Sequence, residues 1–345
     1  MKKTSFSSCV NNQDLRKRFS FTQVPASHPT SVKMSLTNWS FTPFPPLPAT
    51  ILPNAAFWNA TNPVNNITYQ IQVSWPFEWS SRNVANKTAL SILDERYVLD
   101  GNALAGTASE AFKRRKPVSF SQPDAVVISV GYPLTDSVYD LSQRATDFRP
   151  PLSTPQTPPS GADPFLAFLT SSLRPFVKST VFPNINFTRD ALYGHSFGGL
   201  FVLWSLIQNP NNFDTYLSAS PALDWNNASL LNDITTRLGN GIDIPGELYS
   251  SNLTSYKLSK PAVMITYGEI EQFPQRKRTE TEAEFQFRKN FIQPFKMTRY
   301  AREAFDRIEG SGRVRDVAVK EYKGQDHSSV GASAVNDGVD YFIDW

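Results

Sequence analysis

The sequence predicts a single α/β domain with a doubly wound, mostly parallel β-sheet, preceded by an N-terminal extension. Segments of strand and helical character alternate over roughly residues 65–345, as they do in successive βαβ units. The run Ala-Val-Val-Ile-Ser-Val at 125–130 is almost continuously apolar, which is typical of a strand covered on both faces. The 345 residues are 40% hydrophobic and 19% charged, so the chain can bury a large core and still form a pocket.

Residues 1–50 are expected to form the extension, and residues 51–345 the domain. The extension is first polar and rich in Ser and Thr, and then carries Pro43, Pro45, Pro46 and Pro48. Such a composition is typical of flexible or wrapping segments that cannot form a core of their own.

The first half of the domain shows strand, turn and helix signals in order. Residues 67–73 alternate apolar and polar side chains, as a half-buried strand does. A short apolar run at 96–99 ends in the turn signal Asp100-Gly101-Asn102. Residues 149–160 carry five prolines and are expected to form a loop or flap. Asp163-Pro164 then predicts the start of a helix.

The second half of the chain continues the alternation. Short β-rich runs are separated by longer stretches with apolar residues at helical spacing. Strands are expected at residues 190–193, 215–219, 262–267 and 317–322, and helices at 200–208, within 279–308 and at 328–343.

The segment Gly194-His195-Ser196-Phe197-Gly198 fits the pattern G-x-S-x-G between a predicted strand and a predicted helix. In that context the serine occupies a strained turn, and the small residues allow the backbone to fold back without clashes. The following helix and the amide of Phe197 would stabilise a developing oxyanion. A plain glycine turn is the alternative interpretation. The flanking elements favour an α/β-hydrolase fold with Ser196 as the nucleophile.

A serine nucleophile needs a general base, which is normally a histidine. The chain has three histidines. His28 lies in the extension, and the ring of His195 cannot easily reach back to Ser196 from the adjacent position. His327 follows the last predicted strand, where α/β-hydrolases carry their base. The sequence therefore predicts His327 as the base.

The acid that orients the base is expected after the strand at 262–267 and before His327. Glu271 is preferred because it stands three residues beyond Gly268. Glu269 is a direct competitor, and Asp224 is a third candidate. The alternative role for both glutamates is that of carboxylates at a helix N-terminus.

A second oxyanion donor is expected from the turn after residues 96–99, at Gly101 or Asn102. The alternative is that these residues form only a simple turn. The expected mechanism needs no metal and no organic cofactor.

Composition argues against several other classes of protein. A net charge of +3 indicates neither nucleic acid nor a membrane surface as a partner. No apolar run approaches the ~20 residues of a membrane span. The basic runs at 113–116 and 276–278 are expected to be solvated. The oligomeric state is not indicated.

A cytoplasmic location is expected. Cys9 is the only cysteine, which fits a reducing compartment, and the basic N-terminus is not followed by an apolar stretch. Seven N-x-[ST] sequons would need secretion to be glycosylated, and they carry less weight than the absence of a signal. The sequons are at Asn38, Asn59, Asn66, Asn86, Asn186, Asn227 and Asn252.

Six short motifs occur in order along the chain: Tyr97-Val98-Leu99-Asp100-Gly101-Asn102, Val130-Gly131-Tyr132-Pro133, Arg144-Ala145-Thr146-Asp147-Phe148, Gly194 to Gly199, Ser218-Ala219-Ser220-Pro221 and Gly268-Glu269-Ile270-Glu271-Gln272. Together they resemble the putative-esterase family that contains the bacterial enterobactin esterases. The likeness covers about residues 65–345 and is greatest to the fungal siderophore esterases that act on fusarinine C and triacetylfusarinine C.

The resemblance implies hydrolysis of ester bonds in a ferric hydroxamate siderophore after uptake, which releases iron inside the cell. Iron would arrive with the substrate. Some bacterial members work with a Ser-His dyad, so the acid stays open. Arg144 and Asp147 match an R-x-x-D motif on the substrate side, and their alternative role is an ion pair that anchors the Pro-rich flap. Trp225 is expected either to line the pocket or to pack.

Two other functions remain open. A general carboxylesterase, such as a feruloyl esterase or an S-formylglutathione hydrolase, would share the serine turn. A catalytically dead siderophore-binding protein is the alternative of another class, and the intact serine, histidine and glycines argue against it.

Overall fold

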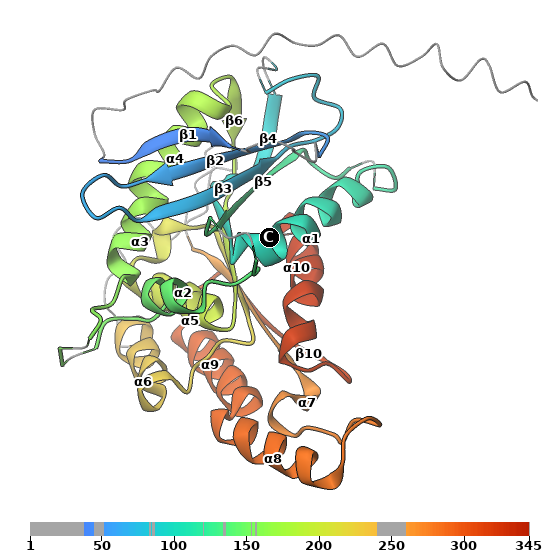
Figure 1. The fold of residues 1–345 in the computed structure, drawn as a ribbon. Helices are drawn as coiled ribbons and strands as arrows, with labels where there is room; N and C mark the ends of the chain where they lie inside the picture. The colour runs from blue at the N-terminus through green and yellow to red at the C-terminus, as the bar shows by residue number, and fades with distance from the viewer. Residues whose placement is uncertain are drawn as a thin grey trace, which may run out of the picture.

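The computed structural model describes residues 38–44, 52–82, 84, 87–119, 121–133, 136–152, 154–155, 157–239 and 260–344. Within these residues, ten strands form one sheet (Figure 1). The strands are β1 (Ser40–Phe44), β2 (Ala55–Thr61), β3 (Thr68–Ser74), β4 (Lys87–Leu99), β5 (Ala125–Gly131), β6 (Ile185–Phe187), β7 (Ala191–His195), β8 (Thr215–Ala219), β9 (Ala262–Gly268) and β10 (Asp316–Tyr322).

The sheet is antiparallel at one edge and parallel through its centre. Its order is β1-β2-β3-β5-β4-β7-β8-β9-β10, and β6 pairs with β4. The pairs among β1, β2, β3 and β5 are antiparallel, and the pairs from β5 to β10 are parallel. The predicted α/β class with a mostly parallel sheet is confirmed.

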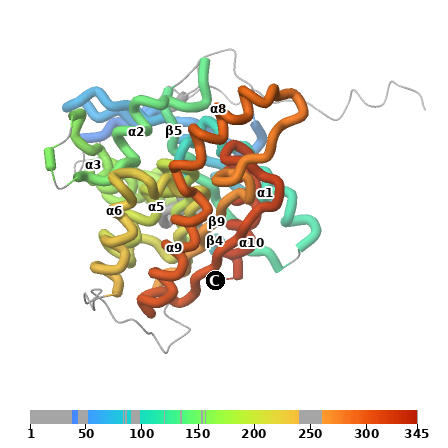
Figure 2. Tube along the Cα trace, turned by 90° about the horizontal axis from the view of Figure 1, so that it is seen from below, coloured from blue at the N-terminus to red at the C-terminus, as the bar shows by residue number. Residues whose placement is uncertain are grey.

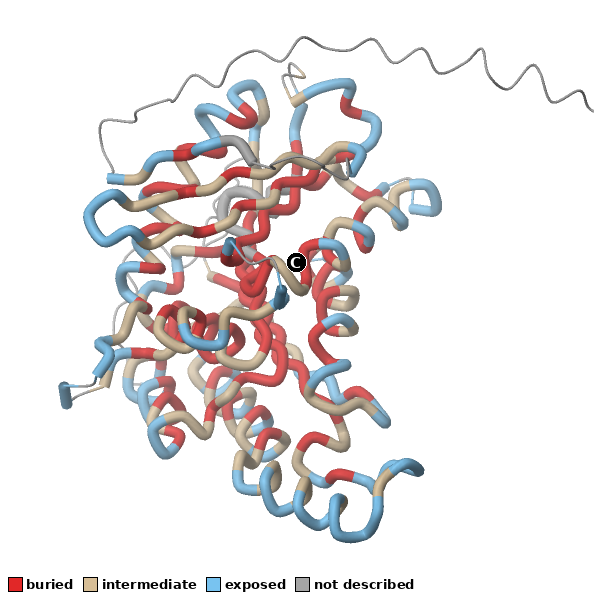
Figure 3. Tube along the Cα trace, in the orientation of Figure 1, coloured by how far each residue is buried: buried red, intermediate tan, exposed pale blue. Residues whose placement is uncertain are grey.

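Burial follows the pattern read from the residues. Every residue of β5, β7, β8 and β9 is buried, as expected for parallel strands covered by helices. In β3 buried and half-buried residues alternate, as the sequence of this strand predicts. Figure 3 shows the buried central strands and, at the lower end of the molecule, the largely exposed α8 (Glu282–Ile292).

Helices cover both faces of the sheet (Figures 1 and 2). On one face, α1 (Gly101–Arg115) and α10 (His327–Asp344) pack against each other and the sheet. On the other face lie α5 (Phe197–Gln208), α6 (Trp225–Ile234) and α9 (Met297–Ser311). The remaining helical elements are α2 (Leu141–Asp147), α3 (Ala162–Phe168), η2 (Leu169–Leu173), α4 (Arg174–Phe176), η3 (Val177–Val181), η4 (Pro210–Asn212), η5 (Thr235–Gly239), α7 (Glu269–Gln272) and η6 (Gln293–Phe295).

Part of the predicted extension belongs to the sheet. Residues 1–37 and 45–51 lie outside the described residues, but Ser40–Phe44 forms edge strand β1 and pairs with β2. Phe41 of β1 is buried and stacks on Phe176, with ring centroids 3.9 Å apart. Among the described residues, no helix combines the length and apolar character needed to cross a membrane.

Candidate active site

Ser196 connects β7 to α5 in a conformation that few residues adopt. Its φ is 61° and its ψ is −118°, which places a non-glycine residue at positive φ. The amide of Ser196 donates to Ala219 O at 2.9 Å, and Ser196 O accepts from the amide of Ala222 at 3.1 Å. Strand β8 and the segment after it therefore hold the strained turn in place.

Glycine is required at the turn because the backbone approaches itself closely. A Cβ on Gly194 would lie 2.3 Å from Gly198 O, and one on Gly199 would lie 2.8 Å from Ala219 O. These contacts explain the small residues on either side of Ser196. Phe197, directly after the serine, is the first residue of α5.

The structure brings Glu271 to His327. Glu271 Oε2 lies 2.7 Å from His327 Nδ1, and its other oxygen accepts from Ser220 Oγ and the amide of Gly268, both at 2.5 Å. The Glu271 side chain is 1% exposed, whereas that of His327 is 44% exposed. Three hydrogen bonds therefore hold a buried carboxylate against a histidine that opens to solvent.

Strand topology creates this contact. Strands β8, β9 and β10 are parallel neighbours, so the segments that follow them meet at one edge of the sheet. Ser220 follows β8, Glu271 lies in α7 directly after β9, and His327 follows β10. The carboxyl edge of an open α/β sheet is the usual place for a ligand site.

The two competing carboxylates have other surroundings. Glu269 Oε2 accepts from the amide of Gly324 at 2.8 Å, in the loop after β10. Asp224 precedes α6, and burial raises the pKa of its carboxyl while the charge of His327 opposes that shift.

A cavity of about 480 Å³ opens beside Ser196 and His327. It lies at the carboxyl ends of β7 to β10, and α8, η6 and the start of α9 form its far wall. The lining residues are Ser196, Phe197, Ala222, Asp224, Trp225, Ile270, Glu271, Lys277, Arg288, Phe291, Ile292, Phe295, Met297, Asp326, His327 and Ser328.

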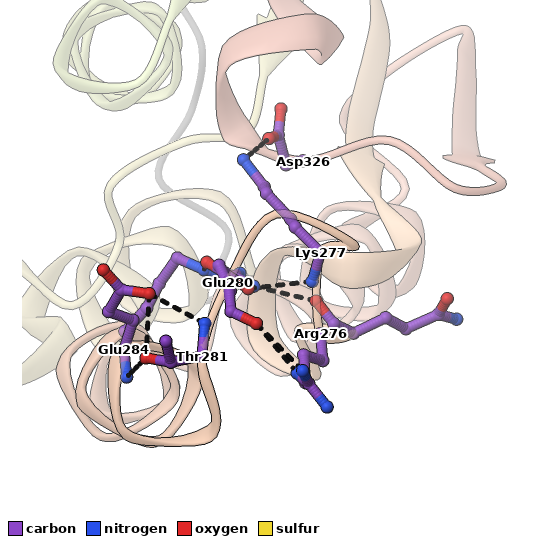
Figure 4. A network of polar contacts seen from close by, with 8 residues as sticks. Arg276, Lys277, Glu280, Thr281, Glu284 and Asp326 are labelled. Atoms are coloured by element: carbon purple, nitrogen blue, oxygen red, sulfur yellow. Dashed lines mark hydrogen bonds and ion pairs between the residues drawn. The ribbon is translucent and has the colours of Figure 1, made fainter.

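Residues 273–296, termed the cap segment below, are held together by a polar network (Figure 4). Both oxygens of Glu280 accept from Arg288, at 2.5 and 2.7 Å, and Glu280 also accepts from the amide of Lys277. Thr281 and Glu284 form a capping box that begins α8.

One ion pair connects the cap segment to the loop that carries the histidine. Lys277 Nζ lies 3.6 Å from the carboxylate of Asp326, the residue before His327, as Figure 4 shows. Lys277 also lines the cavity, as does Arg288. All three residues of the basic run at 276–278 are exposed, as expected, and the central lysine also lines the cavity.

The three residues predicted to stabilise the oxyanion do not all line the cavity. Phe197 lines the cavity, whereas Gly101 and Asn102 are not among the lining residues. The Asn102 side chain binds the backbone of Tyr132 twice, accepting from its N–H at 2.7 Å and donating to its C=O at 2.8 Å. Asp100, in the left-handed conformation, precedes α1, which begins at Gly101.

Arg144 and Asp147 are buried and are not among the residues that line the cavity. Arg144 forms an ion pair, but its partner is Asp100, with two hydrogen bonds of 2.8 and 2.7 Å. Burial disfavours the charge of Arg144, yet the hydrogen bonds and charge of Asp100 leave its pKa raised. Arg144 therefore pairs with Asp100 and not with Asp147, and the substrate-side role of the two residues stays a prediction.

Asp147 has its own buried partners. Its carboxylate accepts from Tyr69 Oη at 3.1 Å, Tyr132 Oη at 3.2 Å and Gln143 Nε2 at 2.9 Å. Burial raises the pKa of Asp147 to about 7, although these three hydrogen bonds oppose the rise. The cluster joins α2 to β3 and to the segment after β5.

Trp225 combines the two roles considered for it. It lines the cavity and packs edge-on against Phe197, with ring centroids 6.4 Å apart. The guanidinium of Arg149 lies 4.5 Å from the centre of its ring. Arg149 begins the Pro-rich segment, so Trp225 links this segment to the cavity.

Comparison with known proteins identifies the family. The sequence matches the family described as putative esterase over residues 69–304. The chain belongs to the putative-esterase family. This putative esterase is 36% identical over 315 residues to the siderophore enterobactin esterase of Emericella nidulans, covering 88% of this chain and 97% of that protein. It is 34% identical over 278 residues to the siderophore triacetylfusarinine C esterase of Aspergillus fumigatus, covering 80% and 89%.

Solved structures agree with this assignment. The siderophore hydrolase EstB from Aspergillus nidulans superposes with a TM-score of 0.76 at 33% identity, covering 86% of this putative esterase and 98% of that chain. The siderophore hydrolase EstA from the same organism gives 0.75 at 36% identity, covering 87% and 98%. The predicted family and α/β-hydrolase fold are confirmed, and the protein is an esterase of the serine hydrolase type.

Several residues of this putative esterase's site were not found from sequence. Ser220, which binds Glu271, stands in the motif Ser218-Ala219-Ser220-Pro221, and its position there was the available signal. Lys277, Arg288 and Phe291 line the cavity from the cap segment. Their sequence carries no motif, so only the folded chain reveals them.

Proposed function

We propose that the protein is a siderophore esterase that hydrolyses ester bonds of a ferric hydroxamate siderophore. The observation that carries this proposal is the convergence of three groups on one cavity. Ser196 stands on a strained turn, His327 lines the same cavity, and the buried Glu271 holds His327 Nδ1. This is the arrangement that nucleophilic ester hydrolysis requires.

The proposed reaction uses these residues in two steps. His327 Nε2 takes the proton of Ser196 as Oγ attacks the ester carbonyl, and then gives it to the leaving alcohol. The acyl-enzyme is hydrolysed by water through the same histidine. Glu271 fixes the imidazole with Nδ1–H toward the carboxylate and stabilises the imidazolium that forms. The amide of Phe197, the residue after the serine, lies at the cavity and stabilises the oxyanion.

Charge at the cavity favours a neutral iron complex. Three hydroxamates balance the charge of Fe³⁺, whereas three catecholates leave a complex with three negative charges. Both cationic side chains among the described lining residues are already paired, Lys277 with Asp326 and Arg288 with Glu280. Asp224 and Glu271 add negative charge to the lining. A trianionic complex would therefore meet unfavourable electrostatics that a neutral complex avoids.

The relatives support the reaction but divide over the substrate. One is named an enterobactin esterase and another a triacetylfusarinine C esterase. The test is to incubate the purified protein with ferric triacetylfusarinine C and with ferric enterobactin and to follow released monomers by mass spectrometry. Faster release from the hydroxamate, lost in Ser196→Ala, supports the proposal. Faster release from the catecholate would overturn the proposed substrate class. If neither siderophore is cleaved, the alternative of a general carboxylesterase is favoured instead.

We also propose that the enzyme acts in the cytosol, on siderophore that has entered the cell. The single cysteine, Cys9, supports this location because the chain cannot use an internal disulfide for stability. Hydrolysis of the siderophore weakens its binding of iron, so iron would be released inside the cell after uptake.

A further inference from the structure

His195, the residue before Ser196, contacts the ring of His327. The two ring centroids lie 4.5 Å apart, and the ring planes are inclined by 38°. His195 is 6% exposed, and its buried Nε2 has no hydrogen-bond partner among the residues that the structure describes. Burial, with the charges of His327 and Arg144, lowers the pKa of His195 to about 3. A neutral, buried ring therefore lies against the proposed base.

Helix α10 confines His195 from another side. A Cβ on Gly331 would lie 3.3 Å from Cγ of His195, tighter than ordinary van der Waals contact. Tyr193, two residues earlier in β7, donates a hydrogen bond to Gly331 O at 2.5 Å. Strand β7 thus contacts the first turns of α10 at two points, and the same strand leads directly into Ser196.

We infer that His195 is a positioning residue, whose ring supports the imidazole of His327 beside Ser196 and keeps water from one face of it. This inference rests on the proposed roles of Ser196 and His327. Glu271 holds the Nδ1 edge of His327 from α7, but a single hydrogen bond leaves the ring free to tilt about it. Contact with His195 restricts that tilt.

Two carboxylates also lie at the cavity near His327. Asp224, from the segment before α6, lines the cavity, as does Asp326, which is paired with Lys277 of the cap segment. The charge of His327 lowers the pKa of Asp224 against the effect of burial.

The first test compares His195→Ala with His195→Phe, using a p-nitrophenyl ester. His195→Ala should lower kcat roughly tenfold or more and change KM less than about threefold, because a displaced base impairs chemistry rather than binding. His195→Phe should restore part of the lost kcat, because it keeps a flat ring against His327 but loses the hydrogen bond of the imidazole with the backbone of His327.

A double-mutant cycle gives an independent test. Gly331→Ala should lower kcat several-fold, because its Cβ displaces the His195 ring, and this effect should vanish in the His195→Ala background, where the Cβ has room. Gly106→Ala in α1 is the matched control, because a Cβ there meets nothing within 4 Å. If His195→Ala does not fold, a folded Gly331→Ala protein still tests the same contact.

Three results would overturn the inference. These are normal kcat in His195→Ala or Gly331→Ala, equal effects of Gly331→Ala in both backgrounds, and no rescue by His195→Phe. Ser196→Ala separates this failure from that of the proposed function. If Ser196→Ala stays active, the proposed nucleophile is wrong. If it is inactive while the His195 variants behave normally, only the positioning role fails.

Discussion

Substitution of Glu271 by glutamine is the sharpest test of the proposed acid. The glutamine oxygen can still accept from Ser220 and the amide of Gly268, as Glu271 does at 2.5 Å, so the local fold should persist. The new amide group would face His327 Nδ1, favour the tautomer with hydrogen on Nε2, and leave Nε2 unable to accept the serine proton. It would also remove the charge that stabilises the imidazolium.

The geometry sets the size of the effect. Opposite unit charges 2.7 Å apart interact with about 6 kcal/mol at an effective dielectric constant of ~20. Because the His327 side chain is 44% exposed, solvent screening should leave roughly 3 to 4 kcal/mol. We therefore expect kcat to fall about 10²- to 10³-fold, with KM changed far less.

Steady-state kinetics on a p-nitrophenyl ester would measure the effect, with two matched controls. Glu269→Gln should change kcat less than about threefold, because within the described part of the chain the Glu269 side chain accepts only from the amide of Gly324. Asp224→Asn should also have the smaller effect. If Glu271→Gln retains more than a tenth of wild-type kcat, or if Glu269→Gln is the weaker enzyme, the reasoning fails. If all three variants stay active, Ser196 and His327 act as a dyad.

Three further predictions follow from the structure. Ser196→Ala should keep the fold, checked by circular dichroism, and retain on the order of 10⁻³ of wild-type turnover or less; near-normal turnover would exclude Ser196 as nucleophile. Because the folded-state pKa of Asp147 is raised to about 7, its protonated form contributes stability that is fully present below about pH 4 and lost as pH rises through 7. Urea unfolding at pH 5 and pH 8 should therefore show a smaller loss of stability in Asp147→Asn than in wild type, and equal losses would contradict the assignment. Native protein should show no mobility shift with an N-glycosidase, although Asn66, Asn186 and Asn227 are exposed enough to accept a glycan; a shift would disprove a cytosolic location.

The central sheet could be predicted because its signals are local. Residues 125–130 and 262–267 are continuous apolar runs, and both form fully buried strands. The edge strands β1 and β2 were not predicted, because their residues alternate less clearly and lie among prolines and asparagines. Their pairing depends on partners that only the folded chain supplies, such as Phe176 against Phe41.

Some residues of the site could likewise be predicted from local signals, and others could not. Ser196 and His327 could be chosen from a motif and by elimination among three histidines, and the structure places both at one cavity. Two glutamates two residues apart could not be ranked firmly from sequence, because the turn at Gly268 decides which one points inward. The partner of Arg144 was misjudged because Asp100 is 44 residues away, and such pairs follow from the position of the β4–α1 turn.

The cap segment has a consequence for how this enzyme can diverge. Helix α8 contributes Arg288, Phe291 and Ile292 to the cavity, yet it has no fully buried residue and takes no part in the sheet. Substitutions there cost the core little packing energy, since they leave no large internal void. Natural variation or laboratory selection can therefore reshape the far wall of the cavity while the serine, histidine and glutamate stay in register. Substrate range and chemical competence are encoded in separate parts of the molecule, and libraries aimed at new esters should be concentrated in residues 273–296.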